Sequence, residues 1–273
     1  MLPIVRIRLT VNRVTPTVRS GARARLTGLM RTELQDRRVL VTGASSGIGT
    51  ATADAVVAAG GRVALLARSA EVLTVHGARL GDRAIVVPAD VTDPGSVATA
   101  MGRIEGEWGG LDAVVNSAGV VRPGGIDVTG PDDWKLTFDV NVLGVLHVVK
   151  AALPLLRRSE LADIVNISSM SGRRRASVAM TVYSASKFAV HVLSDGLREE
   201  LSPDGIRVTI MSPGYVQTPI FDEVPDDGLR ARYQQALADK GLAPEAVAAQ
   251  VVHALGQPAG VNVLELAVLS TGQ

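Results

Sequence analysis

The feature that most constrains the fold is an alternation of short and long apolar patterns that starts at Arg38 and continues along the chain. Short runs rich in β-branched residues are separated by amphipathic stretches of helical length, such as 47–59, 131–157 and 181–201. The short runs predict strands at 38–43, 62–67, 84–89, 112–117, 163–168, 207–212 and 262–268. Such alternation predicts a single doubly wound α/β domain of the Rossmann type, with about seven parallel strands and helices on both faces.

The composition agrees with buried parallel strands. Of 273 residues, 47% are hydrophobic but only 3% are aromatic, so the core must consist of Val, Ala, Leu and Ile. The net charge of +1 gives no argument for a nucleic-acid partner. The longest apolar run, 140–156, is interrupted by Asn141, His147 and Lys150, which argues against a membrane span.

Cysteine and histidine usage bears on the compartment and on metals. The chain has no cysteine, which excludes disulfides and thiolate metal sites and is compatible with a reducing cytoplasm. The four histidines, at 76, 147, 191 and 253, show no metal-ligand spacing with carboxylates. We therefore expect a cytoplasmic protein that holds no metal.

The first 33 residues differ from the rest of the chain. Seven arginines and no acidic residue precede Glu33. We expect a flexible basic extension over 1–33, or a start assigned too early, because Met30 would make an ordinary beginning. An organelle presequence and an extra edge strand over 4–14 stay open. Deleting 1–29 should leave activity and thermal stability unchanged, and the folded domain should span 34–273.

A glycine-rich turn follows the first predicted strand. The sequence TGASSGIG, residues 42–49, leads from this strand directly into a helix. Glycines at 43, 47 and 49 permit a tight turn, close approach of the backbone to a pyrophosphate, and packing of the helix on the strand. The amide groups at the helix N-terminus favour phosphate, so we expect dinucleotide binding here.

Tyr183 and Lys187 stand four positions apart in the helical stretch 181–201, a spacing that places both side chains on one helix face. The chain has only three tyrosines, and only four of its 28 basic residues are lysines, so the pair is unlikely to arise by chance.

The chain resembles the short-chain dehydrogenase/reductase family from Arg38 onward. The resemblance is carried by TGASSGIG, by NSAG at 116–119, by NVLG at 141–144, by ISS at 167–169, by YSASK at 183–187 and by SPGYVQTP at 212–219. It implies an oxidoreductase that transfers a hydride between a nicotinamide and a carbonyl or alcohol substrate. Helices around 131–157 and 181–201 resemble those that pair subunits in the family, which implies a homodimer or homotetramer.

The resemblance assigns the catalytic residues Asn141, Ser169, Tyr183 and Lys187. Tyr183 is implied to be the general acid/base. Lys187 and the positive nicotinamide of the oxidised cofactor are implied to lower the phenol pKa from its usual value of about 10, and Lys187 to hold the nicotinamide ribose. Ser169 is implied to polarise the substrate oxygen. The interval from Ser169 to Tyr183 is one residue longer than the commonest spacing, so Ser168 and Ser171 remain alternatives.

The other implied roles concern support and cofactor binding. Asn141 matches the residue that kinks its helix and holds a water molecule near the lysine, and Asn116 matches one that braces the central strands. Ser117 replaces the family's usual second asparagine. The cofactor-binding residues implied are Gly43, Ser45, Ser46, Gly47, Ile48, Gly49, Arg68, Asp90, Val91, Asn116, Ala118, Gly119, Tyr183, Lys187, Pro213, Gly214, Val216 and Thr218.

The end of the second predicted strand bears on the choice of cofactor. An acidic residue there binds both ribose hydroxyls in NAD-specific proteins. Here Ala67 holds that position and Arg68 follows, while the nearest acid, Glu71, lies in the next helical stretch. An arginine can bind the 2′-phosphate, so we expect NADP.

Substrate identity is not encoded in these motifs. The irregular segment 215–241 is the natural candidate for a lid, and Arg173, Arg174 and Arg175 follow Ser169 in the loop that borders substrate in the family. If one of these arginines points inward, acidic substrates should be preferred. Two alternatives remain: a 3-oxoacyl-carrier-protein reductase, which shares the core motifs, and a regulatory protein that binds the dinucleotide without turnover.

Overall fold

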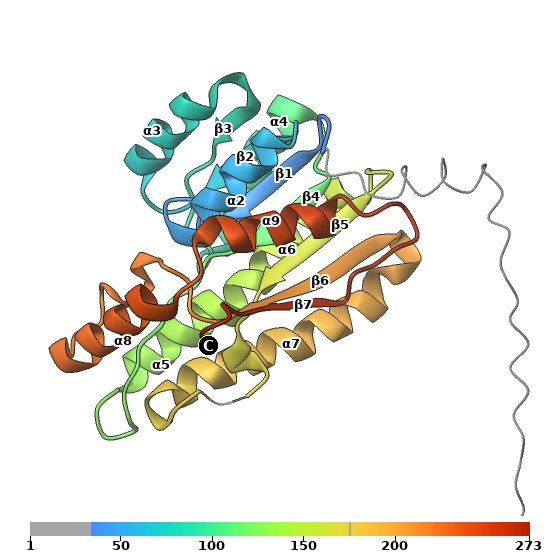
Figure 1. Cartoon of the computed structure of the whole chain (residues 1–273). Coiled ribbons are helices and arrows are strands. Elements are labelled where there is room, and N and C mark those ends of the chain that lie inside the picture. Colours follow the sequence, from blue (N-terminus) through green and yellow to red (C-terminus); the bar gives the residue numbers. More distant parts are fainter. Residues whose placement is uncertain (1–33, 175) are drawn as a thin grey trace, which may run out of the picture.

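Seven parallel strands form one sheet, in the order β3-β2-β1-β4-β5-β6-β7 (Figure 1). The computed structural model describes residues 34–174 and 176–273, so the expected extension over 1–33, the alternative start at Met30 and Arg175 lie outside the described residues. The strands are β1 (Arg38–Thr42), β2 (Arg62–Leu66), β3 (Ala84–Val86), β4 (Ala113–Asn116), β5 (Ala162–Ile167), β6 (Ile206–Pro213) and β7 (Glu265–Val268). The doubly wound fold expected from the sequence is confirmed.

Helices cover both faces of the sheet. They are α2 (Gly47–Ala58), α3 (Ala70–Leu80), α4 (Pro94–Trp108), α5 (Pro131–Phe138), α6 (Gly144–Leu156), α7 (Thr181–Leu201), α8 (Asp227–Lys240) and α9 (Pro244–Leu255). Residues of α2, α3 and α9 pack against one face, and residues of α4, α6 and α7 pack against the other. In β1, Leu40 faces the second layer while Val39 and Val41 face the first, as expected for a strand buried on both sides.

The strand order creates the crevice in which ligands bind in such sheets. The chain runs outward from β1 to β3, crosses back to β4 beside β1, and then runs outward to β7. The connections that leave β1 and β4 therefore diverge to opposite sides of the sheet at the carboxyl ends of these strands. The glycine-rich turn lies at this point.

Strands β3 and β7 are each three residues shorter than the sequence predicts. Strand β3 ends at Val86 and not at residue 89, and Pro88 follows on this edge strand. The N–H groups of Val87 and Ala89 still donate to the carbonyl groups of Leu65 and Ala67. Strand β7 begins at Glu265, three residues later than expected.

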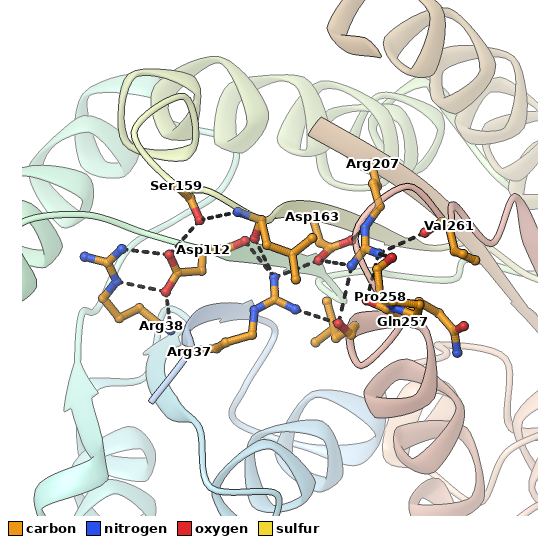
Figure 2. A network of polar contacts seen from close by, with 11 residues as sticks. Arg37, Arg38, Asp112, Ser159, Asp163, Arg207, Gln257, Pro258 and Val261 are labelled. Atoms are coloured by element: carbon orange, nitrogen blue, oxygen red, sulfur yellow. Dashed lines mark hydrogen bonds and ion pairs between the residues drawn. The ribbon is translucent and has the colours of Figure 1, made fainter. Parts of the chain in front are cut away.

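Ion pairs hold the opposite, amino edge of the sheet (Figure 2). The buried Asp163 carboxylate accepts from Arg37 at 2.7 Å and from Arg207 at 2.7 Å. The Arg207 guanidinium also donates to the carbonyl oxygens of Gln257, Pro258 and Val261. These contacts join strands β5 and β6 to the segment after α9. Ion pairs therefore stabilise the amino edge of the sheet, opposite the carboxyl edge where the glycine-rich turn lies.

One helical stretch, 131–156, has the length and mean hydropathy (1.5) of a membrane span within the part of the chain that the structure describes. Half of its apolar window is buried inside the protein, as in the core helix of a soluble fold. Across the described residues, no three His, Cys, Asp or Glu side chains gather as metal ligands would.

Candidate active site

A cleft of about 1110 Å³ opens at the carboxyl edge of the sheet. Its walls come from the turns after β1, β2, β4, β5 and β6 and from the segment 215–241, which holds α8. All three tyrosines of the chain, Tyr183, Tyr215 and Tyr233, line it. In a chain with so few aromatic residues, this concentration marks the cleft as a specialised surface.

The glycine-rich turn forms one wall of the cleft. Gly43 has a φ of +64°, and a Cβ there would lie 2.8 Å from the backbone nitrogen of Ala118. Gly47, with a φ of +51°, would bring a Cβ to 2.7 Å from Cγ2 of Thr218. A Cβ on Gly49 would lie 2.1 Å from the carbonyl oxygen of Gly43. Only glycines leave this turn open, so its shape fits a pyrophosphate held close to the backbone at the start of α2.

Most of the residues expected to bind the cofactor line the cleft. They are Gly43, Ser45, Ser46, Gly47, Ile48, Arg68, Asp90, Val91, Ala118, Gly119, Tyr183, Lys187, Pro213, Gly214, Val216 and Thr218. Gly49 and Asn116 are not among the lining residues. Gly49 packs behind the turn, and Nδ2 of Asn116 donates to Oδ1 of Asn166 at 2.8 Å in the core. Both therefore support the wall without facing the cleft.

Helix α7 presents Tyr183 and Lys187 to the floor of the cleft. Both side chains are buried, Tyr183 at 8% exposure and Lys187 at 5%. Nζ of Lys187 donates to the carbonyl oxygen of Ile167 at 2.9 Å and lies 5.8 Å from the centre of the Tyr183 ring. The four-residue spacing thus places both groups on the inward face of the helix, as expected.

Ser169 lies against Tyr183, whereas Ser168 has a different partner. The side chain of Ser169 lowers the pKa of the Tyr183 phenol. Ser169 also accepts from the backbone N–H of Ser171 at 3.0 Å, which fixes the turn after β5. Ser168 donates instead to the backbone carbonyl of Lys187 at 3.2 Å. This geometry favours Ser169 among the three.

Burial dominates the electrostatics of this pair. It raises the pKa of the Tyr183 phenol to about 12, an effect that the side chain of Ser169 partly opposes. Burial also lowers the pKa of the Lys187 ammonium to about 8. The expected lowering of the phenol pKa by Lys187 is not seen in this structure, where burial raises that pKa. At neutral pH the floor of the cleft therefore holds a protonated phenol.

Asn141 lies in a π-helical turn, Asp139–Leu143, between α5 and α6. Its Oδ1 accepts from the N–H of Val120 at 2.9 Å, and its Nδ2 donates to the Val120 carbonyl at 3.0 Å and to Oγ of Ser186 at 3.1 Å. A Cβ on Gly119 would lie 3.4 Å from Oδ1 of Asn141 and 3.7 Å from Nζ of Lys187. Asn141 thus clamps the loop after β4 close to the lysine, a backbone contact that the sequence motif alone did not reveal.

Arg68 lies exposed at the rim of the cleft, just after β2. No ion pair of Arg68 is found among the described residues, and Ala67 occupies the position where an acid would bind ribose. The carboxylate of Asp90 turns toward its own loop and accepts from the N–H and Oγ1 of Thr92 at 2.9 and 2.8 Å. The guanidinium of Arg68 is therefore available to an anionic ligand.

An apolar cluster that includes Tyr183 joins the segment 215–241 to Val121 and Met180. Its buried members are Val121, Met180, Tyr183, Phe221, Val224, Tyr233 and Leu237. The rings of Phe221 and Tyr233 stack with centroids 4.7 Å apart. Sequence reasoning identified none of these neighbours as site residues; the scarcity of aromatic side chains elsewhere was the available signal.

Charged residues also line the cleft. Arg174 faces it, whereas Arg173 pairs with Glu265 at 3.6 Å. Arg122, which was not predicted, lines the cleft and pairs with Glu223 at 3.4 Å and with Asp133 at 3.8 Å.

Comparisons with known proteins agree with this geometry. Residues 37–228 match the family described as short chain dehydrogenase. An uncharacterized oxidoreductase of Staphylococcus aureus strain MW2 is 38% identical over 238 residues, which are 87% of this chain and 98% of the relative.

Two solved structures show similar folds with bound dinucleotides. A short chain dehydrogenase from Burkholderia cenocepacia J2315, in complex with NADP, is 36% identical with a TM-score of 0.77 and covers 86% of this chain and 97% of its own. A short chain dehydrogenase/reductase from Burkholderia phymatum, in complex with NAD, is 26% identical with a TM-score of 0.78. The match covers 86% of this chain and 89% of that protein.

Proposed function

The chain belongs to the short-chain dehydrogenase family of NAD(P)-dependent oxidoreductases, and we propose that it uses NADP to interconvert a small carbonyl compound and its alcohol, with Tyr183 as general acid/base. The observation that carries this proposal is that Ser169 and Tyr183 lie against each other beside the buried Lys187, at the floor of a cleft that the glycine-rich turn opens. A protein that only binds a dinucleotide has no need of this constellation.

The chemistry follows from the protonation of these groups. The nicotinamide of the bound cofactor supplies the hydride for reduction of a carbonyl carbon. Ser169 donates a hydrogen bond to the carbonyl oxygen and orients it toward the phenol. Tyr183, whose raised pKa keeps it protonated, gives its proton to that oxygen as negative charge develops there. In the reverse direction the same phenol oxygen must receive the proton of the alcohol.

Lys187 and Asn141 act behind the proton donor. The buried ammonium, tied to the carbonyl of Ile167, stabilises the phenolate that remains after proton transfer. We propose that Lys187 also holds the nicotinamide ribose and that Asn141 holds a water molecule that returns a proton to it, while the amide of Asn141 fixes the adjoining loop at Val120.

Arg68 supports NADP as the cofactor. Solved relatives carry NADP in one case and NAD in another, so the choice depends on this chain's own residues. An exposed guanidinium at the rim of the cleft, with Ala67 in place of an acid, favours a bidentate contact with a 2′-phosphate. Asp90 and Val91 would then border the adenine.

A spectrophotometric screen of NADPH oxidation across ketones, aldehydes, 3-oxo acids and acyl thioesters tests the proposal. Turnover of any small carbonyl compound that disappears in Tyr183→Phe supports it. Turnover restricted to acyl thioesters would favour the 3-oxoacyl-carrier-protein reductase. Tight NADPH binding without turnover of any class would favour a regulatory protein of the cytoplasm and would contradict an enzymatic role.

An exposed apolar surface on α7 and the neighbouring π-helical turn supports self-association. Phe188 and Val192 are exposed on α7, and Phe138 and Leu143 are exposed on the α5–α6 stretch that packs against α7. We propose that this surface pairs two copies of the chain in a homodimer or homotetramer. Light scattering of Val192→Glu, in which a charge is placed on the surface, should show a smaller particle than the wild type.

A further inference from the structure

The segment 215–241, called the lid segment from here on, begins and ends at one place. Val216 and Leu242 form a parallel bridge. The N–H of Gln217 donates to the carbonyl of Leu242 at 2.9 Å, and the N–H of Leu242 donates to the carbonyl of Tyr215 at 2.8 Å. The lid segment is thus a closed excursion from the end of β6, and whatever holds its base controls how α8 and Phe221 lie over Tyr183.

The side chain of Gln273 joins both strands of that base. Its Oε1 accepts from the N–H of Tyr215 at 2.7 Å. Its Nε2 donates to the carbonyl of Lys240, the last residue of α8, at 2.9 Å and contacts the carbonyl of Tyr215 at 3.3 Å. Oγ of Ser270 donates to the same Lys240 carbonyl at 2.6 Å. One primary amide therefore satisfies backbone groups at the first residue of the lid segment and at the end of its helix.

Gly214 shows how closely Gln273 approaches the cleft wall. A Cβ at Gly214 would lie 2.1 Å from Oε1 of Gln273 and 2.5 Å from Cδ2 of Leu269. Gly214 has no positive φ, so its backbone conformation does not require glycine. The absent side chain instead makes room for Gln273, which lines the cleft together with Leu269, Gly214 and Tyr215.

We propose that Gln273 is a positioning residue, which fixes the wall at Gly214 and Tyr215 and the base of the lid segment through its amide group. The consequence for catalysis depends on the proposed function, in which this wall lies along the nicotinamide. Without the amide, Tyr215 and Lys240 lose their shared partner, the base opens more often, and the wall is less well placed for cofactor and substrate.

Limited trypsin digestion of the full chain tests the structural part without any need for activity. The lid segment contains Arg230, Arg232 and Lys240 as cleavage sites, and mass spectrometry identifies cuts there. We expect Gln273→Ala to be cut in the lid segment about fivefold faster than the wild type, the effect of losing roughly one net hydrogen bond. Gln235→Ala is the matched control, because among the described residues the Gln235 side chain bonds only to Asp239, on the exposed side of α8.

Steady-state kinetics test the catalytic part. Gln273→Ala should raise the KM for NADPH and lower kcat, whereas Gln235→Ala should change neither.

Gln273→Glu keeps the acceptor for Tyr215 but lacks the donor for Lys240, so its rate of lid cleavage should lie between those of the wild type and Gln273→Ala. Equal cleavage of Gln273→Ala and the wild type, equal acceleration in the control, or faster cleavage spread over the whole chain would overturn the proposal. Absence of turnover in the wild type would contradict the proposed function but leave the cleavage result interpretable.

Discussion

Nζ of Lys187 lies 5.8 Å from the centre of the Tyr183 ring and donates to the carbonyl oxygen of Ile167 at 2.9 Å. The ammonium is therefore tied to the end of β5 and stands beside the phenol without a direct bond to it. Such an arrangement fixes a positive charge near the position where a phenolate forms, while the resting phenol keeps its proton.

We expect Tyr183→Phe to reduce kcat by at least about 10²-fold, because general acid/base groups contribute 10²- to 10⁴-fold. The substitution removes only the hydroxyl, so the ring still packs with Phe221 and the fold should persist. Stopped-flow or steady-state assays give the rate, and thermal melting with NADPH titration gives the control. Near-normal turnover of this variant would contradict the mechanism.

The buried ammonium of Lys187 predicts an unusual pH dependence of stability. Its pKa is about 8 in the folded protein, against 10.5 for an ordinary lysine, so the unfolded chain binds more protons between these values. The contribution of Lys187 to the free energy of unfolding therefore rises with pH between about 8 and 10.5. It is lost as the pH falls through 8. The wild type should gain about 1 kcal/mol of unfolding free energy between about pH 7 and pH 9, relative to Lys187→Met.

Urea unfolding of both proteins at the two pH values measures this difference. The Tyr183 phenol does not interfere, because its pKa is raised from 10 to about 12 and its own window lies above the test range. The same pH response in wild type and Lys187→Met would show that the ammonium is not buried as described.

Arg68→Ala should weaken NADPH use and leave NADH nearly unchanged. We expect the wild type to prefer NADPH by at least about tenfold in kcat/KM, which corresponds to about 1.4 kcal/mol. Arg62→Ala is the matched control, since Arg62 is exposed at the opposite end of β2. Initial rates with both cofactors decide the matter; a preference for NADH in the wild type would refute the reading of Ala67 and Arg68.

Arg174 and Arg173 offer an internal comparison for substrate charge. Arg174 faces the cleft, whereas Arg173 is engaged by Glu265. If Arg174 contacts substrate, Arg174→Ala should raise the KM of a carboxylate-bearing substrate several-fold more than that of its neutral analogue, while Arg173→Ala affects both alike. Equal changes for the two substrates in both variants would exclude such a role.

Substitution of the buried Asp163 should lower the free energy of unfolding more than substitution of most other residues. Replacing it with alanine leaves Arg37 and Arg207 without their carboxylate at the amino edge of the sheet, which should cost about 3–5 kcal/mol. Asp204→Ala breaks an exposed pair with Arg157 and should cost less than about 1 kcal/mol. Urea midpoints compare the two, and similar losses would mean that the Asp163 pairs are as weak as a surface pair.

The sheet could be predicted because each strand carries its own local signal. The run from Arg38 to Thr42 is apolar and bounded by a glycine turn, and Tyr183 and Lys187 fall on one face through helix geometry alone. Their hydrogen bonds could not be predicted in the same way. The amide of Asn116 meets Asn166 across neighbouring strands, and Gln273 meets Tyr215 across 58 positions of sequence.

The raised pKa of Tyr183 in this structure could not be predicted for a related reason. The sequence shows that a lysine stands one helical turn away, which favours the phenolate, but it does not show how thoroughly Phe221, Met180 and Val121 exclude water from the phenol. Burial depends on residues that are distant in the chain, and here it is the main cause of the raised phenol pKa.

The placement of all three tyrosines in the cleft has a spectroscopic consequence. Tyr183 lies on the floor, Tyr215 at the base of the lid segment and Tyr233 on α8. Each tyrosine therefore lines a different part of the same cleft. Biosynthetic incorporation of fluorotyrosine would place three fluorine nuclei there and none elsewhere in the chain. A fluorine NMR spectrum of the intact protein is then a spectrum of this cleft alone, with every resonance reporting on ligand entry.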